Sequence, residues 1–107
     1  MSDIYFERQH GLDFESARAK AQAWLQEAEN QFGLNINYIK GNNQDNASIH
    51  KAGVDAQATL TADKITFQAK LGLFAKPLKG VISSGIKEGL DNYFPQSWVE
   101  MMIFLDG

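Results

Sequence analysis

The sequence contains no cysteine among its 107 residues. This absence excludes disulfide frameworks, thiolate metal ligands and cysteine nucleophiles, and it fits a reducing compartment. Only two histidines occur, His10 and His50, whereas a protein metal site needs several convergent ligands. No pattern places acidic side chains beside both histidines, so we expect neither a metal nor another cofactor.

Basic clusters and long hydrophobic runs are also missing. Ten Lys and Arg residues stand against thirteen Asp and Glu residues, a formal net charge of −3, which argues against a nucleic-acid-binding surface. The basic residues are scattered, so no run of about four to eight of them predicts binding to anionic lipid. The initial stretch MSDIYFERQH lacks the apolar core of a signal peptide, and the dense apolar stretch WVEMMIFL is too short to span a bilayer. We therefore expect a cytoplasmic protein without a transmembrane segment.

Catalytic motifs are absent as well. The sequence has no P-loop, GxGxxG, HExxH, GxSxG or EF-hand pattern. Ser83 and Ser84 have no base in view that could activate them as nucleophiles. Asp55 occupies an outward strand position and Asp63 a turn, and neither place suits a general acid. We assign no catalytic residue and expect no enzymatic activity.

A regular alternation of apolar and polar residues runs from Gly53 to Leu71. A period of two is typical of half-buried strands, so two strands joined by a short turn at 61–64 are expected. The apolar members of the alternation are Val54, Ala56, Ala58, Leu60, Ile65, Phe67, Ala69 and Leu71. Further strands are expected at Ile4–Gln9, at 34–39 and at Ala47–Lys51, with a polar loop at Gly41–Asn46 and a tight turn at Gly53.

Helical spacing predicts two helices. The first begins after an N-cap at Asp13 and ends at Gly33, and its apolar stripe comprises Phe14, Ala17, Ala21, Trp24, Leu25, Ala28 and Phe32. The second covers about 74–94, becomes regular near Pro77 and ends before Pro95. Its stripe comprises Phe74, Leu78, Val81, Ile82, Ile86, Leu90, Tyr93 and Phe94. The aromatic residues on these stripes and strands, Trp24, Phe32, Phe67 and Phe74, are predicted to lie in the core.

Three glycines, Gly80, Gly85 and Gly89, interrupt the second helix. Each costs about 1 kcal/mol relative to alanine in a helix interior. Two explanations remain open: the helix lies close to the sheet or to the first helix, or it is flexible or kinked.

We therefore predict an α+β fold in which a mostly antiparallel five-stranded sheet packs against two helices. The element order is β-α-β-β-β-β-α, followed by a short apolar C-terminal tail. Residues 1–95 are predicted to form a single domain and residues 96–107 the tail.

Two groups of residues are candidates for binding. Arg8 and His10 share one face at the end of the first strand and could bind an anion or carboxylate, although local hydrogen bonds to Asp13 or Glu15 are favoured. The tail is the second candidate, because contiguous exposed apolar surface marks interaction sites; folding back onto the domain is an equal alternative. Its candidate residues are Trp98, Val99, Met101, Met102, Ile103, Phe104 and Leu105.

Several stretches of the sequence resemble the polyhydroxyalkanoic acid system family. The matching residues are Arg8-x-His10-x-Leu12, Ala17-Arg18, Phe32-Gly33-Leu34, Gly53-Val54, Lys70-Leu71-Gly72, and Lys79 and Ile86 before Leu90-Asp91. The resemblance covers residues 3 to 92. It implies a bacterial cytoplasmic protein with an accessory, non-enzymatic role either in polyhydroxyalkanoate metabolism or at the surface of storage granules, and it supplies no catalytic residues. The amide-rich loop Gly41–Asn46 and the tail depart from the family pattern.

Three functional hypotheses follow. The first is a non-catalytic protein whose apolar surface adsorbs to a polyhydroxyalkanoate granule or to granule proteins. The second is a module that binds a small apolar ligand such as an acyl chain, with room made by the small residues Ala56, Ala58 and Ala69; tight packing over these residues is favoured. The third is a homo-oligomeric adaptor, for example a homodimer formed through the tail.

Overall fold

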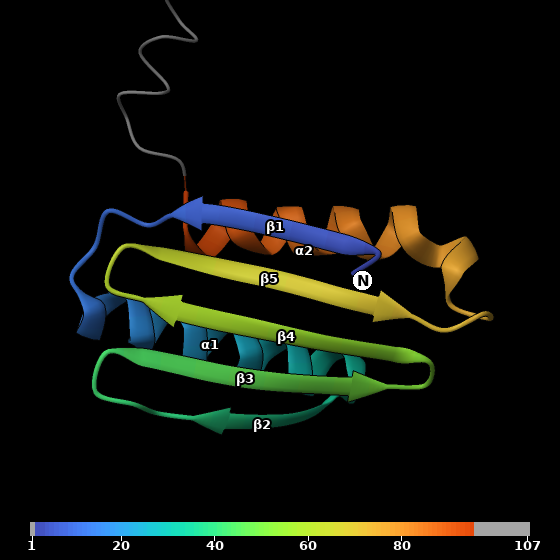
Figure 1. Cartoon of the computed structure of the whole chain (residues 1–107), viewed down its shortest axis with the longest axis horizontal. Coiled ribbons are helices and arrows are strands. Elements are labelled where there is room, and N and C mark those ends of the chain that lie inside the picture. The colour runs from blue at the N-terminus through green and yellow to red at the C-terminus, as the bar shows by residue number, and fades with distance from the viewer. Residues whose placement is uncertain (1, 96–107) are drawn as a thin grey trace, which may run out of the picture.

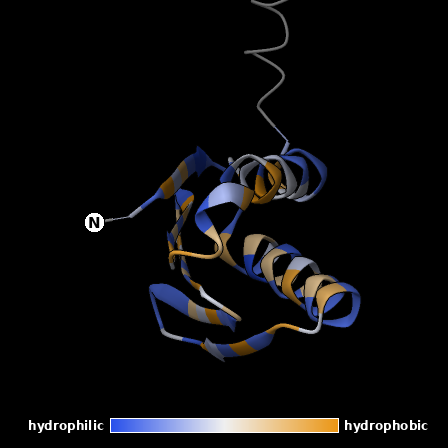
Figure 2. Cartoon of the chain, turned by 90° about the vertical axis from the view of Figure 1, so that its right-hand side faces the viewer, coloured by the Kyte–Doolittle hydropathy of each residue, from blue (hydrophilic) through white to orange (hydrophobic). Residues whose placement is uncertain are grey.

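The alternating segments form one five-stranded antiparallel sheet, and two helices cover one of its faces (Figure 1, Figure 2). The computed structural model of the chain describes residues 2–95. The elements are β1 (Ile4–Gln9), α1 (Phe14–Phe32), β2 (Asn35–Ile39), β3 (Gln44–Lys51), β4 (Val54–Thr61), β5 (Lys64–Leu71), a 3-10 turn (Lys76–Leu78) and α2 (Lys79–Tyr93). The predicted α+β class and element order are confirmed.

The strands lie in the order β1-β5-β4-β3-β2, and every neighbouring pair is antiparallel. Strands β2 to β5 form a meander with short connections, whereas β1 pairs with the last strand. Helix α1 therefore connects the two edge strands, β1 and β2, and crosses the sheet to do so (Figure 1). Helix α2 follows β5 and lies behind β1 (Figure 1).

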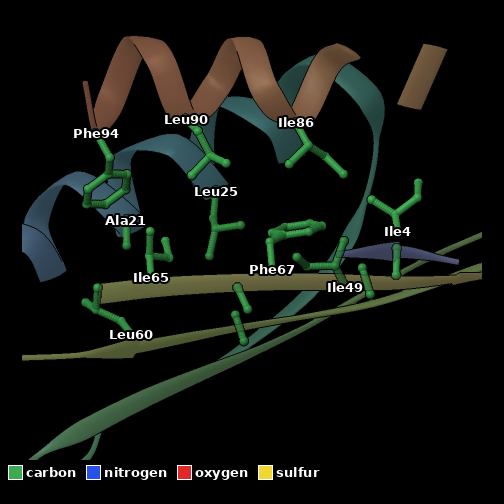
Figure 3. Close-up of a cluster of buried hydrophobic side chains, with 14 of the residues drawn as sticks. Ile4, Ala21, Leu25, Ile49, Leu60, Ile65, Phe67, Ile86, Leu90 and Phe94 are labelled. Atoms are coloured by element: carbon green, nitrogen blue, oxygen red, sulfur yellow. The ribbon is translucent and has the colours of Figure 1, made fainter. Parts of the chain in front are cut away.

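The core fills the space between the sheet and the helices (Figure 3). Figure 3 shows Ile49, Leu60 and Phe67 rising from the strands toward Leu25 of α1 and Leu90 of α2. The other face of the sheet is polar: the cross-strand pairs Gln57–Gln68 and Thr59–Thr66 lie at its centre. This division follows directly from the period of two, because successive side chains on a strand point to opposite faces.

The predicted ends of α1 are confirmed. The carboxylate of Asp13 accepts hydrogen bonds from the Ser16 N–H (3.0 Å) and hydroxyl (2.7 Å), as expected of an N-cap. Gly33 has a φ of 65°, and its N–H donates to Glu29 O at 2.9 Å. This left-handed conformation favours glycine and ends the helix.

Strand β3 is longer than predicted. It begins at Gln44 and not at Ala47, so the second half of the expected polar loop, residues 44–46, belongs to the strand. The reason is Asp45, whose side chain faces the helices and is 1% exposed, while the amide side chains of Gln44 and Asn46 remain in solvent. These three polar residues therefore form part of a strand: the carboxylate of Asp45 takes the inward position, and its two neighbours take the outward positions.

The predicted core position of two aromatic residues is wrong. Phe74 and Phe32 are exposed, whereas Trp24 is partly buried and Phe67 buried. Phe74 precedes α2 and lies in a tight turn in which the N–H groups of Ala75 and Lys76 both donate to Gly72 O. Because α2 begins only at Lys79, its buried side is set by Ile86, Gly89 and Leu90, and the early part of the predicted stripe points to solvent.

Close approach of the helices explains one of the three helical glycines. A Cβ atom at Gly89 would lie 2.5 Å from the indole of Trp24 on α1, whereas Cβ atoms at Gly80 and Gly85 would meet nothing within 4 Å. The Trp24 ring also contacts the rings of Phe67 and Tyr93, with centroids 6.0 and 6.1 Å apart. Trp24 thus joins both helices and the sheet, and Gly89 makes room for it.

We expect Gly89→Ala to destabilise the fold by about 1–2 kcal/mol. The added methyl group overpacks against Trp24, and this cost exceeds the roughly 1 kcal/mol gained in helix propensity. Gly85→Ala, in the same helix, is the matched control and should stabilise by about 0.5–1 kcal/mol. Urea unfolding of both variants measures the difference; equal stabilisation by the two substitutions would contradict the packing role of Gly89.

Candidate functional site

Arg8 lies on the same face of β1 as the buried Ile4 and binds the end of α2. Its guanidinium Nη1 forms an ion pair with Asp91 Oδ1 at 2.8 Å and donates to Phe94 O at 3.1 Å. Its side chain is almost fully buried. Asp91 carries a lowered pKa, because it accepts hydrogen bonds from Arg8 and then from Lys87. Arg8 therefore already holds a carboxylate of its own chain.

His10 is buried beside Arg8 but has separate partners. Its Nδ1 accepts a hydrogen bond from the Leu12 N–H at 3.0 Å, and its Nε2 lies 2.9 Å from Thr61 O. A neutral imidazole with its proton on Nε2 satisfies both contacts, because Thr61 O can only accept. The expected partners Asp13 and Glu15 are not used. Arg8 and His10 lie on one face but bind different parts of the chain.

A buried polar network that sequence reasoning missed surrounds Asp45. Arg18 binds its carboxylate in a bidentate manner, with Nε–Oδ2 at 2.7 Å and Nη2–Oδ1 at 2.8 Å. The Tyr38 hydroxyl donates to Oδ2 at 2.6 Å and the Gly41 N–H to Oδ1 at 3.0 Å. Arg18 Nη2 also donates to Gly41 O at 2.7 Å. The network therefore ties α1 to β3 and to the loop before it.

The electrostatics of this network fit a structural role. Hydrogen bonding from Arg18 is the main reason that the pKa of Asp45 falls to about 2. Burial, followed by the hydrogen bond to Asp45, raises the pKa of Tyr38 above its usual value. Arg18 also stacks over the ring of Phe14, 4.6 Å from its centroid. All these groups are held in one protonation state at neutral pH, so none is available for proton transfer.

The core leaves little room for an apolar ligand. The cavity between α1 and the sheet, next to Trp24 and Asp45, measures about 10 Å³, smaller than the space that one acyl chain needs. A larger groove of about 340 Å³ lies between α1 and β2, but Gln22, Gln26 and Glu29 form much of its wall. The inward alanines Ala56, Ala58 and Ala69 are buried, which agrees with tight packing.

The other polar candidates remain apart from one another. His50 Nδ1 lies 2.7 Å from Asp55 Oδ1 across two strands on the exposed face of the sheet. Asp63 lies in the β4–β5 turn, and Ser83 and Ser84 lie in α2. Residues 2–95 contain no group of three or more His, Cys, Asp or Glu side chains that could hold a metal ion. Within the same residues, neither α1 nor α2 combines the length and the hydropathy of a membrane-spanning helix.

The segment 73–81 is the most apolar exposed surface in the described part of the chain. Phe74 is 92% exposed, Leu73 77%, Val81 73% and Leu78 52%, all within nine consecutive residues. Figure 2 views the molecule from the end where this segment connects β5 to α2. The pattern of apolar residues was visible in the sequence, but helical spacing led to a prediction of core packing for Phe74, Leu78 and Val81. We call this surface the apolar segment 73–81.

The predicted tail site lies outside the described residues. Its members Trp98, Val99, Met101, Met102, Ile103, Phe104 and Leu105 therefore remain a prediction, and so does a homodimer formed through them.

One comparison with known proteins gives a match. Residues 4–94 match the model of a protein family described as "putative polyhydroxyalkanoic acid system protein". Neither a curated protein nor a solved structure matches the chain. The matched range contains the ion pair between Arg8 and Asp91 and the network around Asp45.

Asp45 should make stability depend on acid pH. Its pKa is about 2 in the fold against 3.8 ordinarily, so its contribution is complete above pH 4 and is lost as the pH falls through 2. The difference corresponds to about 2 kcal/mol. We expect Asp45→Asn to lower the unfolding free energy at pH 6 by about 3 kcal/mol. As the pH falls, the unfolding free energies of the variant and of the unchanged protein should approach each other.

Urea unfolding between pH 2 and 6 measures this effect. Tyr38→Phe, which removes one donor and leaves the carboxylate bound to Arg18, is the milder variant and should lose about 1 kcal/mol. If the difference in unfolding free energy between Asp45→Asn and the unchanged protein stays constant from pH 2 to 6, the lowered pKa of Asp45 is wrong.

Proposed function

This chain belongs to the family of polyhydroxyalkanoic acid system proteins, and from that membership we propose that it is a non-catalytic accessory protein that adsorbs to polyhydroxyalkanoate storage granules in the cytoplasm. In this proposal the folded domain presents a binding surface and contributes no reaction step. The storage polymer is an aliphatic polyester, so its surface is apolar and uncharged. An apolar surface on the protein is the chemistry that would recognise it.

The exposure of the apolar segment 73–81 is the observation that carries this proposal. Leu73, Phe74 and Val81 are each more than 70% exposed, although large apolar side chains usually lie inside a domain. Burying each such side chain against apolar material stabilises the bound state by about 1.5–3 kcal/mol. Several of them together are enough for adsorption.

The polar interior supports a non-catalytic role. Every buried side-chain nitrogen and oxygen of the described residues has a hydrogen-bond partner. The buried charges, Arg8 and Asp45, are bound to groups of opposite charge within the fold. An active site would need polar groups directed at a substrate, whereas these groups hold elements of the fold together.

The test is co-sedimentation with isolated polyhydroxyalkanoate granules. We expect the full chain to sediment with the granules and the double variant Leu73→Ser, Phe74→Ser to lose at least 90% of the bound protein, because the loss of two apolar side chains weakens binding by well over tenfold. Because both side chains are exposed, the variant should keep its stability to within about 0.5 kcal/mol, which urea unfolding checks. Ile39→Ser is the matched control, since Ile39 is 57% exposed on β2, away from the segment.

A chain that ends at Pro95 separates the segment from the tail. Adsorption by this shorter chain would assign binding to the folded domain. If the shorter chain fails to bind while Leu73→Ser, Phe74→Ser binds normally, the tail is the adsorbing element and the role of segment 73–81 is wrong. Failure of the full chain to bind granules at all would overturn the proposed function.

A further inference from the structure

The basic residues are unevenly distributed along the chain. Five of the ten Lys and Arg residues, and none of the thirteen Asp and Glu residues, lie between Lys64 and Lys87. The five lysines are separated by apolar and small residues, so they do not form a basic run in the sequence. The fold nevertheless places part of this positive charge within the apolar segment 73–81.

Two of these lysines, Lys76 and Lys79, belong to the apolar segment 73–81 itself. Lys64 and Lys87 form ion pairs with Glu7 at 3.2 Å and with Asp91 at 3.1 Å. Lys76 and Lys79 are exposed, and neither takes part in the ion pairs formed among residues 2–95. Their positive charge is therefore directed to solvent next to Leu73, Phe74, Leu78 and Val81.

One carboxylate lies close enough to these lysines to respond to them. Asp3 accepts a hydrogen bond from the Leu71 N–H at 2.8 Å. This bond is the main cause of its lowered pKa, and the charges of Lys76 and Lys79 lower it further. Asp3 is thus already engaged by the backbone, and it offsets only part of the charge of two lysines.

The same end of the sheet carries further lysines. The Gly72 N–H donates to Gly53 O at 2.6 Å, which joins the start of the segment to the β3–β4 turn. Lys51 ends β3 beside this turn, and its ammonium group donates to Phe32 O at the end of α1. Lys70 is exposed near the end of β5. In Figure 1 the ends of β3 and β5 and the start of α2 lie together at the right.

We propose that the apolar segment 73–81, with Lys76 and Lys79, is an interfacial binding site for an anionic phospholipid layer. Leu73, Phe74 and the apolar side chains after them enter the acyl region, and the two ammonium groups bind headgroup phosphates. Apolar side chains beside lysines are typical of proteins that lie at a lipid surface, and each lysine near such a surface adds to the affinity. This inference rests on the proposed function, because it specifies what the same surface contacts.

Charge distinguishes lipid from the other candidate occupants. A bare polyester surface is uncharged and gives Lys76 and Lys79 no partner. A second copy of the chain docked through the same segment would bring like-charged lysines together. A layer with phosphate headgroups over acyl chains matches both the charge and the apolar character of the segment.

The test uses the full chain and sedimentation with vesicles. Vesicles of phosphatidylglycerol and phosphatidylcholine in equal parts should bind the protein at least tenfold more tightly than vesicles of phosphatidylcholine alone. The variant Lys76→Gln, Lys79→Gln should bind the anionic vesicles about 30-fold more weakly, the value expected for two lysines near an anionic surface. Lys20→Gln, Lys40→Gln is the matched control, because it removes the same charge from exposed positions elsewhere and should bind as the unchanged protein does.

A parallel experiment with lipid-free particles of polyhydroxybutyrate separates the two proposals. Equal binding to anionic and neutral vesicles, no vesicle binding, or equal losses from both lysine pairs would overturn the lipid inference. If the protein adsorbs to the lipid-free particles, the proposed granule function stands, whether or not the protein binds vesicles. Binding to anionic vesicles without binding to granules or particles would support the lipid inference and overturn the granule function.

Discussion

Removing one face of the sheet from water is the constraint that organises this molecule. Side chains such as Ile49, Leu60 and Phe67 share that face, and burying apolar surface stabilises a fold by about 25 cal/mol per Å². Helices α1 and α2 each cover part of this face, and the indole of Trp24 lies between them. The absent side chain of Gly89 is the condition for this contact, because it lets α2 approach the ring.

Charges inside the fold secure the edges of this arrangement. The bidentate contact between Arg18 and Asp45 fastens α1 to β3, and the contact between Arg8 and Asp91 fastens α2 to β1. A buried charge without a partner is strongly destabilising, so each pair restricts the register of the element that carries it. Arg8, Arg18 and Asp91 are among the residues that carry the family resemblance, and their contacts give these positions a structural explanation.

The sequence predicted those features that depend on local periodicity. The limits of β1, the N-cap at Asp13 and the end of α1 at Gly33 follow from neighbouring residues alone. It did not predict the burial of Asp45, because the partner Arg18 is distant in sequence and a carboxylate normally marks a loop. It also predicts Phe74 in the core, since the apolar spacing of α2 continues back to Phe74 in the turn that follows Gly72. The apolar segment 73–81 lies in this stretch, and its lysines, Lys76 and Lys79, are too widely spaced in the sequence to indicate a basic cluster.

The pairing of β1 with β5 has a consequence for how the chain acquires its structure. The register joins Ile4 to Ala69 and Gln9 to Lys64. Strand β1 is therefore synthesised before β2 to β5 but can pair only after β5 has been made. Strands β2 to β5 can associate by local hairpins, which form quickly, whereas contacts of long sequence separation are slow to close. We therefore expect the hairpins to form first during synthesis, with an open edge on β5. Until β1 docks there, that edge is open to pairing with another chain.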